Sequence, residues 1–132
     1  MKKILLVEDD QSISLAIGMS LKAMGYELFT AADAATAVAQ ARKANPDVAI
    51  LDINLPGGDG FVVAERLQQL VQTSSVPIIF ITASKQEGLR ERAKQLGAVH
   101  FIEKPFGVTQ LADAIETACA GPAELVGDVQ IG

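Results

Sequence analysis

The stretch Ile4-Leu5-Leu6-Val7-Glu8-Asp9-Asp10 decides the fold, because four apolar residues run without interruption into three acidic ones. A continuous apolar run of this length is typical of a strand that is buried on both faces, as in a parallel sheet. Similar runs occupy residues 48–51 and 77–81, and they lead into Asp52 and Thr82. The sequence therefore predicts several buried strands with polar side chains at their carboxyl ends.

Segments with helical periodicity separate these runs. Ile13, Ile17 and Leu21 recur at helical spacing, and Gly25 is suited to end that helix. The predicted strands cover residues 4–7, 26–30, 48–51, 77–81 and 99–102, and the predicted helices cover 13–24, 34–44, 61–71, 85–96 and 108–119. Strictly alternating strands and helices predict an α/β fold, a doubly wound parallel sheet of five strands with helices on both faces.

Length and composition limit the function. The 132 residues suit one domain, which we place at residues 1–120, with residues 121–132 as a tail or the start of a linker. The net charge of −5 disfavours direct binding of nucleic acid. The single cysteine, Cys119, excludes an internal disulfide and favours a cytoplasmic protein. The apolar runs are too short for a signal peptide or a membrane span.

Polar residues at the strand ends carry the predicted chemistry. Ligands of open α/β sheets bind beyond the carboxyl ends of the strands. Glu8 and Asp9 follow the first strand, Asp52 ends the third, and Thr82 and Lys104 follow the fourth and fifth. Carboxylates from two strands repel one another unless a cation such as Mg²⁺ compensates them, and Mg²⁺ commonly acts beside phosphate. The residues therefore predict an aspartate that accepts a phosphoryl group.

Five motifs in order resemble the receiver domain of bacterial two-component response regulators, the CheY-like family. They are Leu5-Leu6-Val7-Glu8-Asp9-Asp10, Leu51-Asp52-Ile53-Asn54-Leu55-Pro56 with Asp59-Gly60, Ile81-Thr82-Ala83, Leu96-Gly97-Ala98 and Lys104-Pro105-Phe106. The resemblance covers residues 2 to about 120. It implies a flavodoxin-like fold with strand order 2-1-3-4-5.

The resemblance also implies a role for each matching residue. Asp52 matches the phosphorylated aspartate, and Lys104 matches the lysine that pairs with the phosphoryl oxygens. Thr82 matches the switch hydroxyl and Phe101 the switch aromatic, where the family often has tyrosine. The metal ligands are implied to be side chains of the acidic pair and of the phosphoacceptor, plus one backbone carbonyl: Glu8, Asp9, Asp52 and Asn54.

The resemblance further implies how the protein works with partners. A sensor histidine kinase or a phosphotransfer protein donates the phosphoryl group, with Mg²⁺ as cofactor. The domain promotes its own aspartyl phosphorylation and dephosphorylation without being a conventional enzyme. Output passes to another protein or an attached effector domain through residues 85–103, from Lys85 to Glu103, and the last helix. We expect no membrane contact, and a monomer or a weak dimer.

Three alternatives remain open at this point. The chain can be a receiver cut from a longer regulator or hybrid kinase with a DNA-binding or enzymatic output. An aspartyl phosphatase or phosphotransferase is disfavoured, because Asn54 stands where such enzymes place a second acid. A degenerate receiver that only binds partners is disfavoured, because every chemical position is filled. For Asp10 we favour a carboxylate that interacts with a helix dipole, and for Asp59 a turn or cap residue, over metal binding. For His100 we favour a half-exposed position on a strand.

Overall fold

The computed structural model describes residues 1–120, and the predicted tail or linker at 121–132 lies outside the described residues. Five parallel strands form one sheet in the order β2-β1-β3-β6-β7. They are β1 (Lys3–Val7), β2 (Glu27–Ala31), β3 (Val48–Asp52), β6 (Ile78–Thr82) and β7 (His100–Glu103). In chain order these are the first to fifth strands, so the predicted fold class and the order 2-1-3-4-5 are confirmed.

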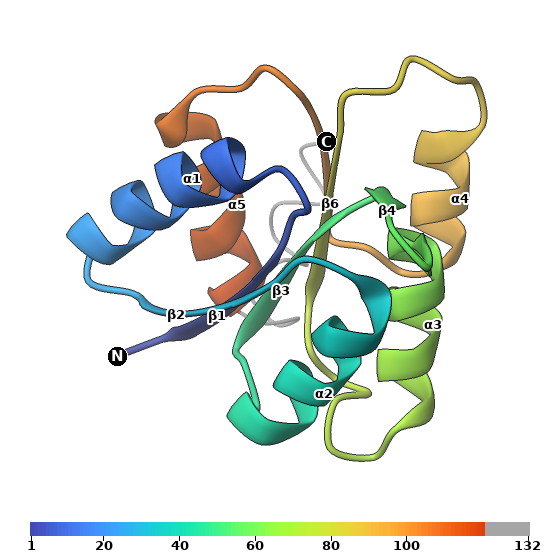
Figure 1. The fold of residues 1–132 in the computed structure, drawn as a ribbon, viewed down its shortest axis with the longest axis horizontal. Helices are drawn as coiled ribbons and strands as arrows, with labels where there is room; N and C mark the ends of the chain where they lie inside the picture. Colours follow the sequence, from blue (N-terminus) through green and yellow to red (C-terminus); the bar gives the residue numbers. More distant parts are fainter. Residues whose placement is uncertain (121–132) are drawn as a thin grey trace.

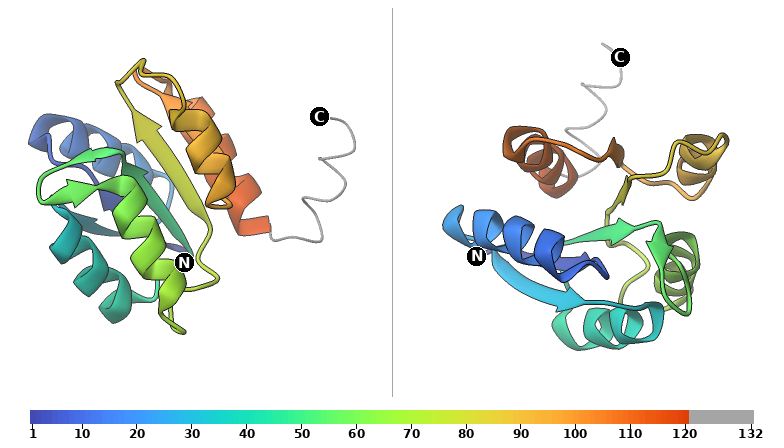
Figure 2. Two further views of the ribbon diagram at one scale, coloured as in Figure 1. Left: turned by 90° about the vertical axis from the view of Figure 1, so that its right-hand side faces the viewer. Right: turned by 45° about the horizontal axis from the view of Figure 1, so that its top comes forward.

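Five helices within residues 1–120 cover both faces of this sheet (Figure 1). They are α1 (Gln11–Ala23), α2 (Ala34–Ala44), α3 (Gly60–Gln69), α4 (Leu89–Gln95) and α5 (Val108–Ala120). Helices α1 and α5 lie together on one face, and α2, α3 and α4 lie on the other; the right-hand view of Figure 2 separates the same two groups. None of these helices is long and apolar enough to cross a membrane.

Burial explains which segments form the central strands. Every residue of β3 and β6 is buried, whereas the outer strands β2 and β7 are buried only in part. Alternate residues of a strand point to opposite faces, so the side chains of the sheet contribute to two apolar cores, one on each face. One core joins Leu5, Leu51 and Phe80 to α2, α3 and α4, and the other joins Ile50 and Ile81 to α1 and α5. The sheet is thereby a rigid base for the residues at its carboxyl edge.

Two local predictions were wrong, and one local feature was missed. Val71 is 94% exposed and lies beyond α3, because the Thr73 hydroxyl donates to the Leu67 carbonyl (2.7 Å) and closes the helix earlier. Helix α4 begins at Leu89 rather than near residue 85, after Gly88 in the left-handed region (φ 86°). The loop after Asp52 contains a short antiparallel hairpin, β4 (Asn54–Leu55) and β5 (Gly58–Asp59), which we did not predict.

Candidate functional site

The predicted site residues gather at one edge of the sheet. Glu8 follows β1 directly, Asp52 ends β3, Thr82 ends β6, and Lys104 follows β7. The Lys104 Nζ donates to Glu8 Oε1 (2.5 Å) and to Asp52 Oδ2 (2.8 Å). Parallel strands end at the same edge, so residues up to 96 positions apart in sequence meet in one place.

Three carboxylates converge around this lysine. Glu8, Asp9 and Asp52 each offer an oxygen, and these oxygens lie within 4.8 Å of one another. Glu8 and Asp52 are buried, whereas the Asp9 side chain is exposed. Burial, followed by the nearby Asp52 carboxylate, raises the pKa of Glu8 to about 7, although Lys104 opposes the shift. When all three carboxylates are ionised, they carry more negative charge than one ammonium can compensate.

Lys104 is itself well enclosed. Its side chain is 13% exposed, and burial alone would lower its pKa. The hydrogen bonds to Asp52 and Glu8 outweigh burial, so the pKa of Lys104 is raised and the ammonium form is favoured. The main chain fixes the residue as well, because the Lys104 N–H donates to the Thr82 carbonyl oxygen (2.8 Å). Lys104 is thus held as a cation between two buried acids.

The backbone around Asp52 orients its carboxylate. The N–H of Asn54 donates to Asp52 Oδ1 (2.9 Å), while Lys104 holds the other oxygen. The hairpin then turns the chain back, so that Gly60 packs directly against the end of β3. A Cβ at Gly60 would lie 2.4 Å from the Asp52 carbonyl oxygen. The absence of a side chain at residue 60 is therefore a condition for the position of Asp52.

The two predicted switch residues lie on neighbouring strands. Thr82 is fully buried, and its Oγ1 accepts the N–H of Ser84 (3.0 Å). Phe101 is half-buried on β7, opposite Phe80 of β6, and packs on the side of α3 and α4. Thr82 belongs to the same edge as Asp52, whereas Phe101 lies two residues before the end of its strand. Their switch roles stay predictions.

Asp10 and Asp59 both act as helix caps; we favoured a helix N-terminus for Asp10 and a turn or cap for Asp59. Asp10 is the N-cap of α1 and accepts the N–H of Ile13 (3.1 Å), and Asp59 is the N-cap of α3 and accepts the N–H of Val62 (2.9 Å). Such caps satisfy N–H groups that a helix leaves free. His100 is a half-buried strand residue whose pKa is lowered by burial. Within residues 1–120 its Nε2 has no hydrogen-bond partner.

The donor set suits a hard divalent cation. Three convergent carboxylates provide the oxygen ligands that Mg²⁺ prefers, and the exposed Asp9 leaves an open side for water. Excess negative charge at a buried edge is costly unless a cation compensates it. The predicted ligand at Asn54 is a backbone carbonyl, and the residue stands at the rim of the same edge, two positions after Asp52. The chemistry of these residues therefore fits a magnesium ion.

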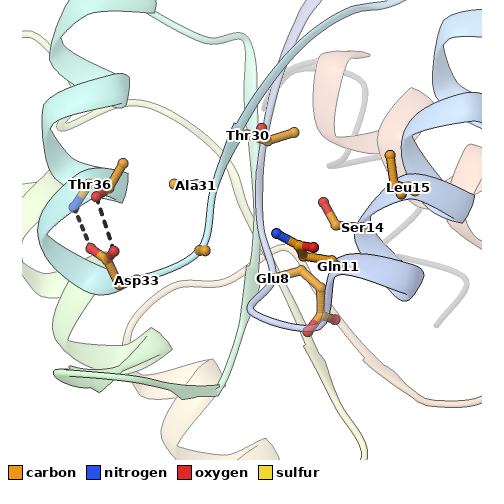
Figure 3. A pocket seen from close by; sticks show the side chains of 9 residues that line it. Glu8, Gln11, Ser14, Leu15, Thr30, Ala31, Asp33 and Thr36 are labelled. Atoms are coloured by element: carbon orange, nitrogen blue, oxygen red, sulfur yellow. Dashed lines mark hydrogen bonds between the residues drawn. The ribbon is translucent and has the colours of Figure 1, made fainter.

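A separate pocket of about 470 Å³ opens beside the carboxylate cluster. Figure 3 shows Glu8, Gln11 and Ser14 on the α1 side, and Thr30 and Asp33 on the side of β2 and α2. In the same view the Asp33 carboxylate is engaged by Thr36, which donates its N–H (2.8 Å) and hydroxyl (3.1 Å). Of the cluster itself, only Glu8 lines this pocket among the described residues. The candidate site therefore lies at the carboxyl edge of the sheet, and the pocket lies beside it.

The ion pairs of Glu103, next to the site, were missed by reasoning from sequence. Glu103 precedes Lys104 and accepts hydrogen bonds from Lys85 Nζ (2.7 Å) and Arg90 Nη2 (3.3 Å). These bonds, and the attraction of Lys85 and Arg90, lower the pKa of Glu103. The many charged residues in 85–94 indicated that ion pairs could form there. The spacing of these residues in the sequence did not show which strand they would contact.

Comparison with known proteins agrees with this geometry. Residues 4–116 match the family described as response regulator receiver domain. The DNA-binding dual master transcriptional regulator RpaA of a Synechocystis species is 33% identical over 84% of this chain and 46% of its own length. Protein PilH of Pseudomonas aeruginosa is 31% identical over 92% of this chain and 100% of its own length.

One similar solved structure contains a magnesium ion. The receiver domain of the sensor histidine kinase PA1611 from Pseudomonas aeruginosa, with a magnesium ion in its active-site cleft, is 30% identical. It aligns with a TM-score of 0.83 over 91% of this chain and 98% of that chain. The chain spans about half the length of most of the curated relatives it matches, such as RpaA. With its fold, its acidic edge and its sequence all in agreement, the chain belongs to the response regulator receiver domain family.

Proposed function

We propose that Asp52 accepts a phosphoryl group from a sensor histidine kinase or a phosphotransfer protein. The observation that carries this proposal is the position of Lys104, whose Nζ contacts Asp52 Oδ2 (2.8 Å) beside Glu8 and Asp9. A carboxylate nucleophile and a cation for the phosphoryl oxygens are thereby side by side at the carboxyl edge of the sheet. In the family, phosphorylation at such an edge is the typical activity.

The transfer step needs a nucleophile and charge compensation. A carboxylate oxygen of Asp52 forms a bond to phosphorus while the bond from phosphorus to the donor breaks, and that electron pair leaves with the donor. The product is an acyl phosphate on Asp52. The Lys104 ammonium is placed to attract the phosphoryl oxygens, and the N–H of Asn54 holds the carboxylate in a fixed orientation.

We propose Glu8, Asp9, Asp52 and the backbone carbonyl of Asn54 as the residues that hold Mg²⁺. A bound Mg²⁺ would neutralise negative charge on the carboxylates and on the transferred group. The convergence of three carboxylate oxygens within 4.8 Å supports this assignment. Asp9 is the exposed member and so is placed at the solvent side of the site.

We propose that Thr82 and Phe101 pass the change on to the surface. Thr82 is hydrogen-bonded to Lys104 through its backbone and precedes the loop that leads to α4. A shift of the Thr82 hydroxyl toward the phosphoryl group would break its bond with the Ser84 N–H (3.0 Å). The output surface comprises residues 85–103 and α5, which face a partner protein or an attached effector domain.

The proposed receiver unit is residues 1–120, since α5 ends at Ala120 and residues 4–116 match the family. Relatives such as RpaA are about twice as long as this chain and PilH has about its length, so both an attached and a separate output have precedents. The proposed output surface serves either arrangement.

Labelling with a small phosphodonor tests the phosphorylation site. Incubation of the full chain with acetyl phosphate and Mg²⁺ should add the mass of one phosphoryl group, with acetate as the leaving group. Asp52→Asn should abolish this increase, because the amide cannot form the acyl phosphate. Asp113→Asn, an exposed acid on α5, is the matched control and should be labelled as the native chain is. Full labelling of Asp52→Asn would refute the assignment.

A further inference from the structure

Helix α4 carries two arginines with matching surroundings. The Arg90 guanidinium lies 4.6 Å from the centre of the Phe101 ring, and Arg92 lies 4.5 Å from the centre of the Phe61 ring. Each arginine also pairs with a glutamate, Arg90 with Glu103 (3.3 Å) and Arg92 with Glu65 (3.4 Å). The two sets combine a cation–π contact and an ion pair in almost the same geometry.

The two sets hold α4 to different elements. Arg92 joins α4 to α3 through Phe61 and Glu65, and we call these three residues the α3 clamp. Arg90 joins α4 to β7 through Phe101 and Glu103, and we call these three residues the β7 clamp. Figure 1 shows α4 next to α3 on this face of the sheet.

The clamps matter because the remaining packing of α4 is sparse. Of its seven residues, only Ala93 is fully buried, and the helix starts after Gly88, which is in the left-handed region. A short helix with few buried apolar contacts has low local stability. On the α3 side, the Gln68 Nε2 also donates to the Leu96 carbonyl oxygen (2.6 Å). Helix α4 is therefore more firmly attached to α3 than to β7.

The β7 clamp is connected to the carboxylate cluster through the side chain of Lys104, whereas the α3 clamp approaches the end of β3 through the backbone of Gly60, which precedes Phe61. Glu103 is the residue before Lys104, whose Nζ binds Glu8 and Asp52. Lys85, in the loop that follows Thr82, binds the other oxygen of Glu103 (2.7 Å). The aromatic partners differ as well, because Phe61 is 1% exposed within the core, whereas Phe101 is half-buried on an edge strand. Movement at Lys104 or Thr82 thus reaches the β7 clamp first.

We propose that Arg90 is a positioning residue that holds Phe101 and α4 in their unphosphorylated arrangement, and that phosphorylation of Asp52 opens the β7 clamp while the α3 clamp persists as the pivot. This inference rests on the proposed phosphorylation of Asp52. The side chains of Arg90 and Glu103 are 55% and 41% exposed, so their attraction is weakened by solvent. A weak clamp suits a switch, because a local change of charge can then shift the population between two arrangements.

Hydrogen exchange measured by mass spectrometry tests the clamp, with Arg90→Gln compared to the matched variant Arg92→Gln. The full chain is studied with and without acetyl phosphate and Mg²⁺, and intact mass reports phosphorylation in the same samples. In the native chain, phosphorylation should speed amide exchange in α4 and around Phe101. Arg90→Gln should speed this exchange by about threefold to tenfold before phosphorylation and leave little further increase, since one exposed pair and one cation–π contact are lost.

Labelling by acetyl phosphate supplies a second readout that a purely structural role would not move. If the open arrangement is the one that reacts, Arg90→Gln populates it more and should reach half-maximal labelling at a severalfold lower acetyl phosphate concentration. Arg92→Gln should speed exchange in both states alike and leave the half-maximal concentration unchanged. Arg90→Lys, which keeps the charge, should restore most of the native behaviour.

The outcomes separate the two proposals. Suppose that the native chain is labelled and that phosphorylation changes the exchange rates of Arg90→Gln and Arg92→Gln equally. This result would overturn the role of Arg90 and leave the proposed phosphorylation of Asp52 intact. Loss of the phosphorylation-dependent change in Arg92→Gln alone would assign the role to the α3 clamp and also overturn the proposal. Absence of any added phosphoryl mass on the native chain would overturn both.

Discussion

At the scale of single residues, Lys104 compensates the charge of the buried carboxylates at the site. It is the one ammonium within hydrogen-bond distance of the buried Glu8 and Asp52 carboxylates in the described chain. A buried acid that loses its cation pays the cost of desolvation without compensation. The lysine therefore stabilises the fold before any phosphoryl group arrives, and the same contacts place it for the proposed transfer.

Lys104→Met should lower the free energy of unfolding by about 1–3 kcal/mol in chelator at neutral pH, because it leaves the buried acids without their hydrogen-bond donor. Urea denaturation measures the change. Lys85→Met is the matched control, since it also removes an ion pair with a glutamate but from a side chain that is 73% exposed. It should change the stability by less than about 0.5 kcal/mol. Equal losses in the two variants would contradict the importance of burial here.

At the scale of elements, the approach of α3 to β3 depends on Gly60. The N–H of Gly60 donates to the Ile53 carbonyl oxygen (2.8 Å), and the helix starts at this residue. A methyl group would lie 2.4 Å from the Asp52 carbonyl oxygen and 3.0 Å from the Ile53 Cα, both of them backbone atoms that cannot rotate away. The end of β3 and the start of α3 would have to separate.

Gly60→Ala should therefore lower the free energy of unfolding by about 1–3 kcal/mol, the usual cost of overpacking. It should also reduce labelling of Asp52 by acetyl phosphate, since the carboxylate would move with its backbone. Gly107→Ala is the control, because a Cβ there meets no atom within 4 Å. That variant should be neutral or slightly stabilising. A neutral Gly60→Ala in the same urea titrations would show that α3 can shift without cost.

Sequence patterns predicted the elements well where local residues decide them. Helix α2 has the predicted bounds, since Asp33 caps it and Asn45 ends it in the left-handed region before Pro46. The start of α4 was predicted too early, because residues 85–88 lack apolar side chains and depend on Gly88 for their turn. Val71 satisfied the helical period but lies outside α3, since the Thr73 hydroxyl closes the helix through a contact that periodicity does not contain.

The carboxyl-edge residues were predictable for a different reason. Parallel topology brings strand ends together whatever the loops do, so Glu8, Asp52 and Lys104 were expected in one place. Their unequal burial was not predictable, because Glu8 and Asp52 are covered by the fold while Asp9 is exposed. The stacking of Arg90 on Phe101 likewise depends on where α4 ends up against β7. Side-chain pairs between distant segments are fixed by packing and not by local pattern.

At the scale of the whole molecule, the acidic edge links folding to pH and to metal. Glu8 has a pKa of about 7 in the folded protein, above its ordinary value of 4.5. The folded state therefore binds more protons than the unfolded state between these values. The stabilising contribution of Glu8 is present in full below pH 4.5 and is lost as the pH rises through 7. A divalent cation favours the ionised carboxylate and should reverse this trend.

In chelator, the native chain should lose stability relative to Glu8→Gln as the pH rises from about 5 to about 8, by about 2 to 3 kcal/mol. The difference between the two proteins is the quantity to compare, because burial lowers the pKa of His100 and gives both a contribution of opposite sign. Urea titrations at several pH values measure it. Millimolar Mg²⁺ should stabilise the native chain more at the upper pH, where Glu8 is already ionised and no proton must leave. If the native chain instead gains stability relative to Glu8→Gln as the pH rises in chelator, a raised pKa for Glu8 is contradicted. If Mg²⁺ stabilises Glu8→Gln as much as the native chain, the Glu8 carboxylate is excluded from the metal site.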